Sequence, residues 1–99
     1  MQTVKRLEII ASSAELPKLI EKLDAAGVPG YSIIRGVAGK GQDGRVSTDS
    51  DFTSSALSNI YILSFCSEAQ AEDVLTRIRP VLTRYGGVCY FSDATKAVV

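Results

Sequence analysis

The sequence predicts an α+β fold of the split βαβ, or ferredoxin-like, type, and two observations predict it. Apolar residues alternate along four short segments and recur at helical spacing along two others. These segments follow the order strand, helix, strand, strand, helix, strand, and such strands usually lie in the sheet order 4-1-3-2. The 99 residues, 45% of them hydrophobic, suffice for one domain over residues 1–99 with a small core.

The first half of the chain is expected to form a strand, a helix and a second strand. The first strand spans residues 4–11 and places every second residue on one face: Leu7, Ile9 and Ala11. Apolar residues then recur at helical spacing, namely Leu16, Leu19, Ile20, Leu23 and Ala26. Pro17 lacks an N–H and conflicts with a cap on Ser12, so the helix is expected to begin near Glu15 and to end at Gly27. The second strand is expected at residues 30–38.

The second half is expected to form a strand, a helix and a last strand. Residues 58–65 alternate, with Ile60, Ile62 and Ser64 opposed to Tyr61, Leu63 and Phe65. Ser67 and Gln70 have the spacing of a capping box, which predicts a helix that buries Ala71, Val74, Leu75, Ile78, Val81 and Leu82. Gly86 and Gly87 end this helix, and the last strand is expected at residues 88–94.

The helices can cover only one face of this sheet, and the other face also carries apolar residues. Five apolar residues of the expected strands cannot all point at the helices, namely Ile10, Ile33, Ile60, Ile62 and Tyr90. An antiparallel sheet that is apolar on both faces needs a second partner. Oligomerisation through the uncovered face is therefore expected.

Composition excludes several classes of protein. Eleven basic residues balance eleven acidic ones, which argues against a nucleic-acid partner bound through its phosphates. The absence of histidine removes histidine-based metal sites and catalytic triads.

Cys66 and Cys89 lie on strands that are two spacings apart in the expected sheet, roughly 9–10 Å, so they are expected to be free thiols. No apolar run approaches a membrane span of about 18 residues, and no signal-peptide pattern opens the chain, which predicts a cytoplasmic protein.

A long polar loop at residues 39–58 holds the main candidate site. Its "GKGQDGR" segment sets three glycines around Lys40, and such a turn can aim several N–H groups at phosphate oxygens. Arg45 can add a bidentate contact. The alternative is a flexible surface turn with incidental glycines. Asp49 and Asp51 alternate like calcium ligands, but the rest of an EF-hand loop is missing and no metal site is predicted.

The order of elements, the "GYSII…GKG" entry into this loop and the "TRYGGVCYF" segment together resemble the PII signalling superfamily over nearly the whole chain. The chain is most similar to the bicarbonate-related branch, which includes the carboxysome-associated PII protein and the PII-like regulator of a bicarbonate transporter. The resemblance implies a homotrimer of ferredoxin-like subunits with adenine nucleotides bound in the clefts between them. It also implies that the long loop, the T-loop (residues 39–58), folds against the ligand or against a partner protein.

The resemblance assigns roles to individual residues. Gly39, Lys40, Gly41 and Gln42 match the phosphate-contacting turn at the base of the T-loop, and Arg45 lies close to the position of phosphate-binding arginines. Ser32 stands where the family has a nucleotide-contacting threonine. Gly86, Gly87 and Val88 match the B-loop, whose backbone approaches the ligand from the neighbouring subunit. Bicarbonate, as an effector, is expected near Lys40 and Arg45.

Departures from the family pattern modify the expected ligand. Cys89 and Tyr90 stand where a basic residue precedes the final strand, and Lys96 alone replaces a C-terminal arginine pair. Less positive charge near the phosphates predicts that ADP or AMP binds in preference to ATP, while ATP and cyclic AMP stay possible ligands.

The expected function is a non-enzymatic sensor of inorganic-carbon status, with a bicarbonate transporter or a carboxysome component as partner. The alternative is a ferredoxin-like trimer that binds a metal or another small molecule without a nucleotide. An acylphosphatase-like enzyme is disfavoured because the loop after the first strand, "SSAELP", lacks an arginine.

Overall fold

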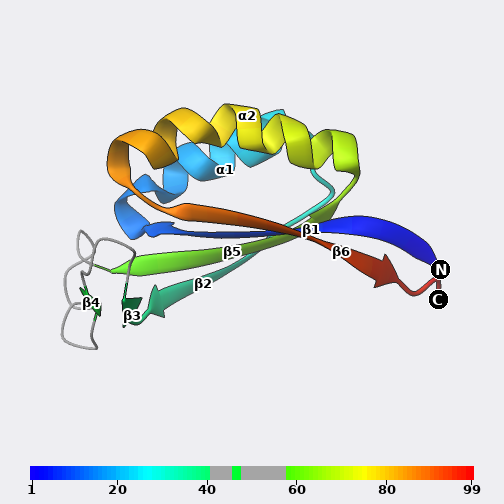
Figure 1. The fold of residues 1–99 in the computed structure, drawn as a ribbon, viewed down its shortest axis with the longest axis horizontal. Helices are drawn as coiled ribbons and strands as arrows, with labels where there is room; N and C mark the ends of the chain where they lie inside the picture. Colours follow the sequence, from blue (N-terminus) through cyan, green and yellow to red (C-terminus); the bar gives the residue numbers. More distant parts are fainter. Residues whose placement is uncertain (41–45, 48–57) are drawn as a thin grey trace.

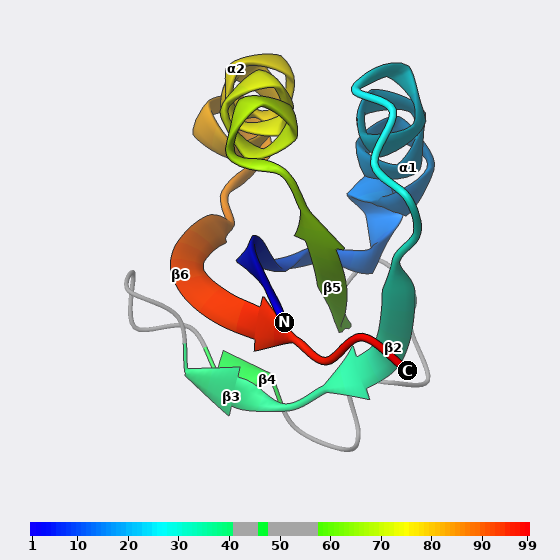
Figure 2. The ribbon, with the colours of Figure 1, turned by 90° about the vertical axis from the view of Figure 1, so that its right-hand side faces the viewer.

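Two helices cover one face of a four-stranded antiparallel sheet in a computed structural model that describes residues 1–40, 46–47 and 58–99 (Figures 1 and 2). The strand order is β2-β5-β1-β6, which is the predicted order 4-1-3-2 read from the opposite edge. A separate two-stranded sheet, β3-β4, follows β2. The elements are β1 (Gln2–Ser12), η1 (Ser13–Glu15), α1 (Leu16–Ala25), β2 (Ser32–Val37), β3 (Gly39–Lys40), β4 (Val46–Ser47), β5 (Asn59–Cys66), α2 (Glu68–Tyr85) and β6 (Val88–Lys96).

The core lies between the sheet and the two helices. The central strand β1 pairs antiparallel with β5 on one side and with β6 on the other. Alternate residues of β1 and β5 and the apolar stripes of both helices meet there and exclude water, which provides the main driving force for folding. The buried apolar residues are Leu7, Ile9, Ala11, Leu16, Leu19, Leu23, Ile60, Ile62, Cys66, Ala71, Val74, Ile78 and Val81.

The helix ends follow local chemistry. Ser12 caps the short helix η1, where its hydroxyl accepts a hydrogen bond from the N–H of Ala14 at 3.3 Å. Pro17 then lies in the first turn of α1, where its missing N–H leaves no bond unmade, so the predicted start near Glu15 is confirmed. At α2, Ser67 and Gln70 form the predicted capping box with bonds of 3.1 and 3.0 Å.

The face of the sheet that points away from the helices, here called the open face, is apolar. The strand register places on it Arg6, Glu8, Ile10, Ile34, Tyr61, Leu63, Phe65 and Tyr90. Ile34, Phe65 and Tyr90 are 58%, 44% and 53% exposed in the single chain. An uncovered apolar face was predicted, and it is present.

The prediction that five apolar strand residues cannot all point at the helices is confirmed, and the structure shows how they divide between the two faces. Ile60 and Ile62 are fully buried beneath the helices, and Ile33 pairs with Ile62 on that same side. Of the five apolar residues considered, only Ile10 and Tyr90 lie on the open face. Side chains alternate with a period of two, so the face of an isoleucine within a strand depends on the register of the whole sheet.

Cys66 and Cys89 are free thiols, as predicted. They lie on β5 and β6, and β1 separates these two strands. Neither described helix is long and apolar enough to cross a membrane.

Candidate functional site

The long loop begins at a bulge in β2. The register with β5 shifts between Arg35 and Val37, and Gly36 there has a φ of +69°. An extra residue in one strand bends it, so the chain leaves the main sheet and forms its own ribbon, with Gly39 opposite Ser47 and Lys40 opposite Val46. The sequence prediction missed this bulge, although an isolated glycine inside a strand pattern is its usual signal.

The described part of the predicted phosphate turn is Gly39 and Lys40, here called the loop base. Both residues are exposed, and a Cβ on Gly39 would meet open space. Packing against the residues that the structure describes therefore gives no reason for glycine at position 39. Gly41, Gln42 and Arg45, together with the acidic pair Asp49 and Asp51, lie outside the described residues, and their predicted roles stay predictions.

The B-loop (Gly86, Gly87 and Val88) is fixed by packing. Gly86 ends α2 with a φ of +88°, and its N–H donates to the carbonyl of Leu82 at 2.9 Å. Gly87 has a φ of +129°, and a Cβ there would come within 2.8 Å of Leu82 Cδ2 and 2.9 Å of the Ile10 carbonyl oxygen. Both glycines thus have a structural reason that is independent of any ligand.

Val37, where the chain leaves β2 for the loop base, and the B-loop lie at the same end of the main sheet on strands at opposite edges. Val37, at the end of β2, pairs with Asn59 of β5, and Val88, at the start of β6, pairs with Ile10 of β1. Two strands separate β2 from β6, which places Val37 and Val88 three spacings apart in the main sheet, about 14 Å. After Val37 the loop base leaves this sheet and forms the separate ribbon β3-β4 (Figure 2).

Ser32 lies at the opposite end of β2 from the loop base. Five residues of extended chain separate Ser32 from Val37, roughly 17 Å. Ser32 lines a cavity of about 720 Å³, here called the Ser32 cavity. Its walls come from four places: the start of β1, the segment before β2, the junction of β5 with α2, and the end of β6. The lining residues are Gln2, Thr3, Val4, Pro29, Gly30, Tyr31, Ser32, Leu63, Ser64, Phe65, Cys66, Ser67, Gln70, Ala94, Thr95 and Lys96.

Two side chains fix one wall of the Ser32 cavity. The buried hydroxyl of Ser64 donates to the carbonyl of Gly30 at 2.7 Å, and the amide of Gln70 donates to the carbonyl of Gly27 at 2.9 Å. Pairing between β2 and β5 ends at Ser32 and Leu63, whereas β5 continues to Cys66. The chain before β2 thus approaches β5 through side-chain bonds. The sequence prediction did not assign these roles, although a serine in the buried row of β5 was a signal.

The open face carries one polar cluster in its centre. The hydroxyl of Tyr61 donates to Glu8 Oε1 at 2.9 Å, and Arg6 Nε lies 3.4 Å from the same oxygen. Burial, followed by the bond to Glu8, raises the pKa of the Tyr61 hydroxyl above its usual range. The carboxylate is therefore satisfied within the chain and adds no free charge to the face.

The described residues offer neither an activated thiol nor a metal-ligand group. Burial raises the pKa of the Cys66 thiol, and it raises that of Cys89 to about 11, so neither thiol is an activated nucleophile near neutral pH. Within residues 1–40, 46–47 and 58–99, no three His, Cys, Asp or Glu residues are grouped as metal ligands would be.

The chain is thus a small α+β protein of the ferredoxin-like class, with a long loop after the second strand of its sheet and a glycine turn before the last. The chain belongs to the nitrogen regulatory protein P-II family, whose model matches residues 4–99. The PII resemblance seen in the sequence is thereby confirmed, and the family is one of regulatory proteins. No curated protein matches the sequence.

Solved structures of PII-like proteins are similar over most of the chain. CPII, a nitrogen regulatory PII-like protein from Thiomonas intermedia K12 bound to ADP, AMP and bicarbonate, is 28% identical with a TM-score of 0.84, covering 94% of this chain and 87% of that chain. CPII bound to ADP, AMP and acetate is 27% identical with a TM-score of 0.81, covering 97% and 90%. A putative PII-like signaling protein from Thermus thermophilus, 24% identical with a TM-score of 0.73, covers 93% and 87% and shares the fold.

Proposed function

We propose that this protein is a PII-like regulator that binds ADP or AMP, in preference to ATP, in clefts between the subunits of a homotrimer. The observation that carries the proposal is the likeness to CPII, which was solved with ADP, AMP and bicarbonate and which this chain matches over 94% of its length. We further propose that bicarbonate is the second ligand and that the T-loop signals inorganic-carbon status to a bicarbonate transporter or a carboxysome component.

The separation of the predicted contacts supports a site shared between subunits. In one chain Val37 and the B-loop residue Val88 are about 14 Å apart across the sheet, and Ser32 is roughly 17 Å along β2 from Val37. A second subunit can bring its own edge or end of the sheet to the first. In this arrangement the base of the nucleotide enters the Ser32 cavity, and its phosphates reach glycine turns at the other end of a sheet.

The open face supports the trimer. Ile34, Phe65 and Tyr90 are exposed there because the helices leave this side of the sheet uncovered. Large apolar side chains exposed on an uncovered sheet face favour a protein interface, and the polar cluster among them is already hydrogen-bonded. Burial of the open face between subunits therefore leaves the Glu8 carboxylate paired.

Positive charge decides the preference among nucleotides. Lys40 is the one basic residue in the described part of the phosphate turn, and Arg45 is proposed to join it. Cys89 and Tyr90 follow the B-loop without a charge. Each charged contact to a phosphate contributes roughly 1.5–3 kcal/mol, so a site with few basic residues favours ADP or AMP over ATP.

The proposal is tested by isothermal titration calorimetry with ADP, AMP, ATP and cyclic AMP, each with bicarbonate or with chloride at the same pH and ionic strength. We expect ADP and AMP to bind more tightly than ATP, and bicarbonate to tighten them. Thermodynamic linkage requires that the nucleotide increase the affinity for bicarbonate by the same factor by which bicarbonate increases the affinity for the nucleotide. Absence of binding by all four nucleotides refutes the nucleotide role, whereas equal affinities in bicarbonate and chloride refute the bicarbonate role alone.

A further inference from the structure

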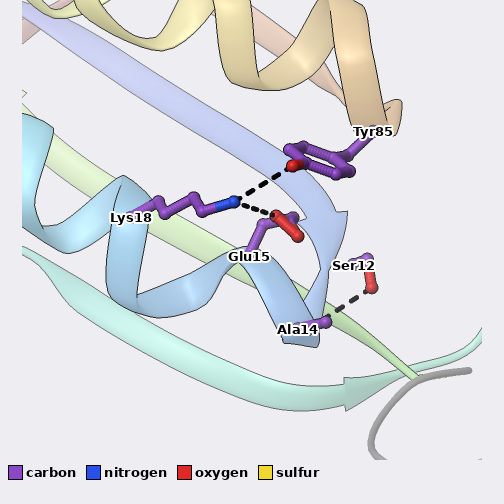
Figure 3. Close-up of polar contacts among 5 residues, drawn as sticks. All are labelled: Ser12, Ala14, Glu15, Lys18 and Tyr85. Carbon is purple, nitrogen blue, oxygen red and sulfur yellow. Dashed lines mark hydrogen bonds and ion pairs between the residues drawn. The ribbon is translucent and has the colours of Figure 1, made fainter.

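Three side chains connect the start of α1 to the end of α2 (Figure 3). Lys18 Nζ donates to the hydroxyl of Tyr85 at 3.2 Å and lies 4.3 Å from the centroid of its ring. The same ammonium lies 3.7 Å from Glu15 Oε2. Figure 3 shows Lys18 reaching from α1 into the space between the carboxylate and the ring. This group is here called the Lys18 clamp.

Glu15 holds Lys18 in place. The residue is 8% exposed, and its Oε2 has no hydrogen-bond partner among the described residues. A buried carboxylate needs a compensating charge, and Lys18 supplies it from the next turn of the chain. Proximity to the amino terminus of α1 also favours the negative charge of Glu15. The ammonium is therefore restrained on the helix side before it meets Tyr85.

Tyr85 is the last residue of α2 and directly precedes the B-loop. The hydrogen bond to Tyr85, followed by the charge of Glu15, raises the pKa of Lys18, so the clamp keeps its charge at neutral pH. Gly87 is already fixed by its close approach to Leu82 and Ile10. The Lys18 clamp restrains the same turn from the helix side, one residue before Gly86.

We propose that Glu15, Lys18 and Tyr85 are positioning residues for the B-loop, and that they hold its N–H groups in the geometry that meets the nucleotide phosphates. The inference rests on the proposed function, since it names what fixes the turn at that site. None of the three residues needs to touch the ligand. A contact between α1 and the last residue of α2, made by side chains 67 positions apart in the sequence, would thereby set nucleotide affinity.

Hydrogen exchange at the Gly86 amide tests the restraint without any ligand, because this N–H is bonded to Leu82. In Lys18→Met, exchange at Gly86 is expected to rise about three- to tenfold, because a cation–π contact and a hydrogen bond are lost. Lys22→Met, which removes the same charge from the same helix, is the matched control and should leave the rate unchanged. Lys18→Arg can keep both contacts and should restore the wild-type rate.

An unchanged rate at Gly86 in Lys18→Met overturns the proposal, and so does a rise shared equally by the amides of β1 and β5, which indicates global loss of stability. Tyr85→Phe keeps the ring and removes the hydroxyl, so it should give a smaller rise in a protein that folds normally. ADP titration of Lys18→Met and Lys22→Met should show a loss of affinity of about three- to tenfold in Lys18→Met alone. Faster exchange with unchanged ADP affinity also overturns the positioning role. Absence of ADP binding by the wild type refutes the proposed function, while the exchange experiment still decides whether the clamp restrains the turn.

Discussion

Replacement of Gly87 by alanine should destabilise the protein strongly, whereas the same change at Gly86 should cost much less. The two glycines are adjacent and both have positive φ angles, +129° at Gly87 and +88° at Gly86. They differ in their surroundings. A Cβ at Gly86 would meet nothing within 4 Å, but a Cβ at Gly87 would lie 2.8 Å from Leu82 Cδ2, 2.9 Å from the Ile10 carbonyl oxygen and 3.1 Å from Ala11 Cβ.

The expected magnitudes follow from these contacts. Gly86 has a φ of +88° and a ψ of 166°, a conformation essentially restricted to glycine that costs an alanine about 1–3 kcal/mol, and the reduced freedom of the unfolded chain returns roughly 0.5 kcal/mol. Gly86→Ala should therefore destabilise by about 1–2 kcal/mol. At Gly87 the Leu82 side chain can move, but the backbone carbonyl of Ile10 belongs to the central strand and cannot. Overpacking adds about 1–3 kcal/mol to a similar backbone cost, so Gly87→Ala should cost about 2–5 kcal/mol.

Urea unfolding of the two variants and the wild type, followed by circular dichroism at one protein concentration, measures this difference. The concentration must be fixed because assembly contributes to the apparent stability of an oligomer. If Gly87→Ala unfolds at the same urea midpoint as Gly86→Ala, the close approach of β1 to the B-loop does not determine the residue at position 87, and the reasoning is refuted.

Three further predictions concern charge, titration and capping. Lys40→Ala should weaken ADP binding by about 10- to 100-fold through loss of a phosphate contact, measured by calorimetry with Lys22→Ala as the control. Unchanged affinity in Lys40→Ala would show that Lys40 is an ordinary surface lysine. Burial raises the pKa of Cys89 from 9.0 to about 11, so its contribution to stability is complete below pH 9 and is lost as the pH rises to about 11. In Cys89→Ser the unfolding free energy should fall less over that pH range than in the wild type, by about 1–2 kcal/mol after allowance for the partial exposure of Cys89. If the two proteins show parallel curves of unfolding free energy against pH, the raised pKa of Cys89 is contradicted. Ser67→Ala removes the hydroxyl that accepts from the N–H of Gln70 and should cost about 1 kcal/mol in urea unfolding, with an unchanged midpoint showing that the capping box adds nothing.

Local patterns in the sequence were enough to predict the four strands of the main sheet and the two α-helices, and the usual order of this fold type then gave the order of those strands. Alternation identified Leu7, Ile9 and Ala11 as the buried row of β1, and spacing identified the capping box that begins α2. These features depend on residues a few positions apart, whose relation is fixed by the periods of strand and helix. The glycine turn after α2 was also recognisable, because glycine readily adopts the left-handed conformation that commonly ends a helix.

The structure decided what depends on residues far apart in the chain. Ile33 and Ile34 are adjacent, and only the pairing with β5 shows that Ile33 faces the helices and Ile34 the open face. The contact of Lys18 with Tyr85 joins residues 67 positions apart, and the bond from Ser64 to Gly30 joins two separate segments. Ser32 and the loop base, predicted together as nucleotide contacts, lie at opposite ends of β2. Sequence patterns define which residues are buried or turn the chain, but the positions at which those residues meet are set by sheet register and helix packing, which no local pattern contains.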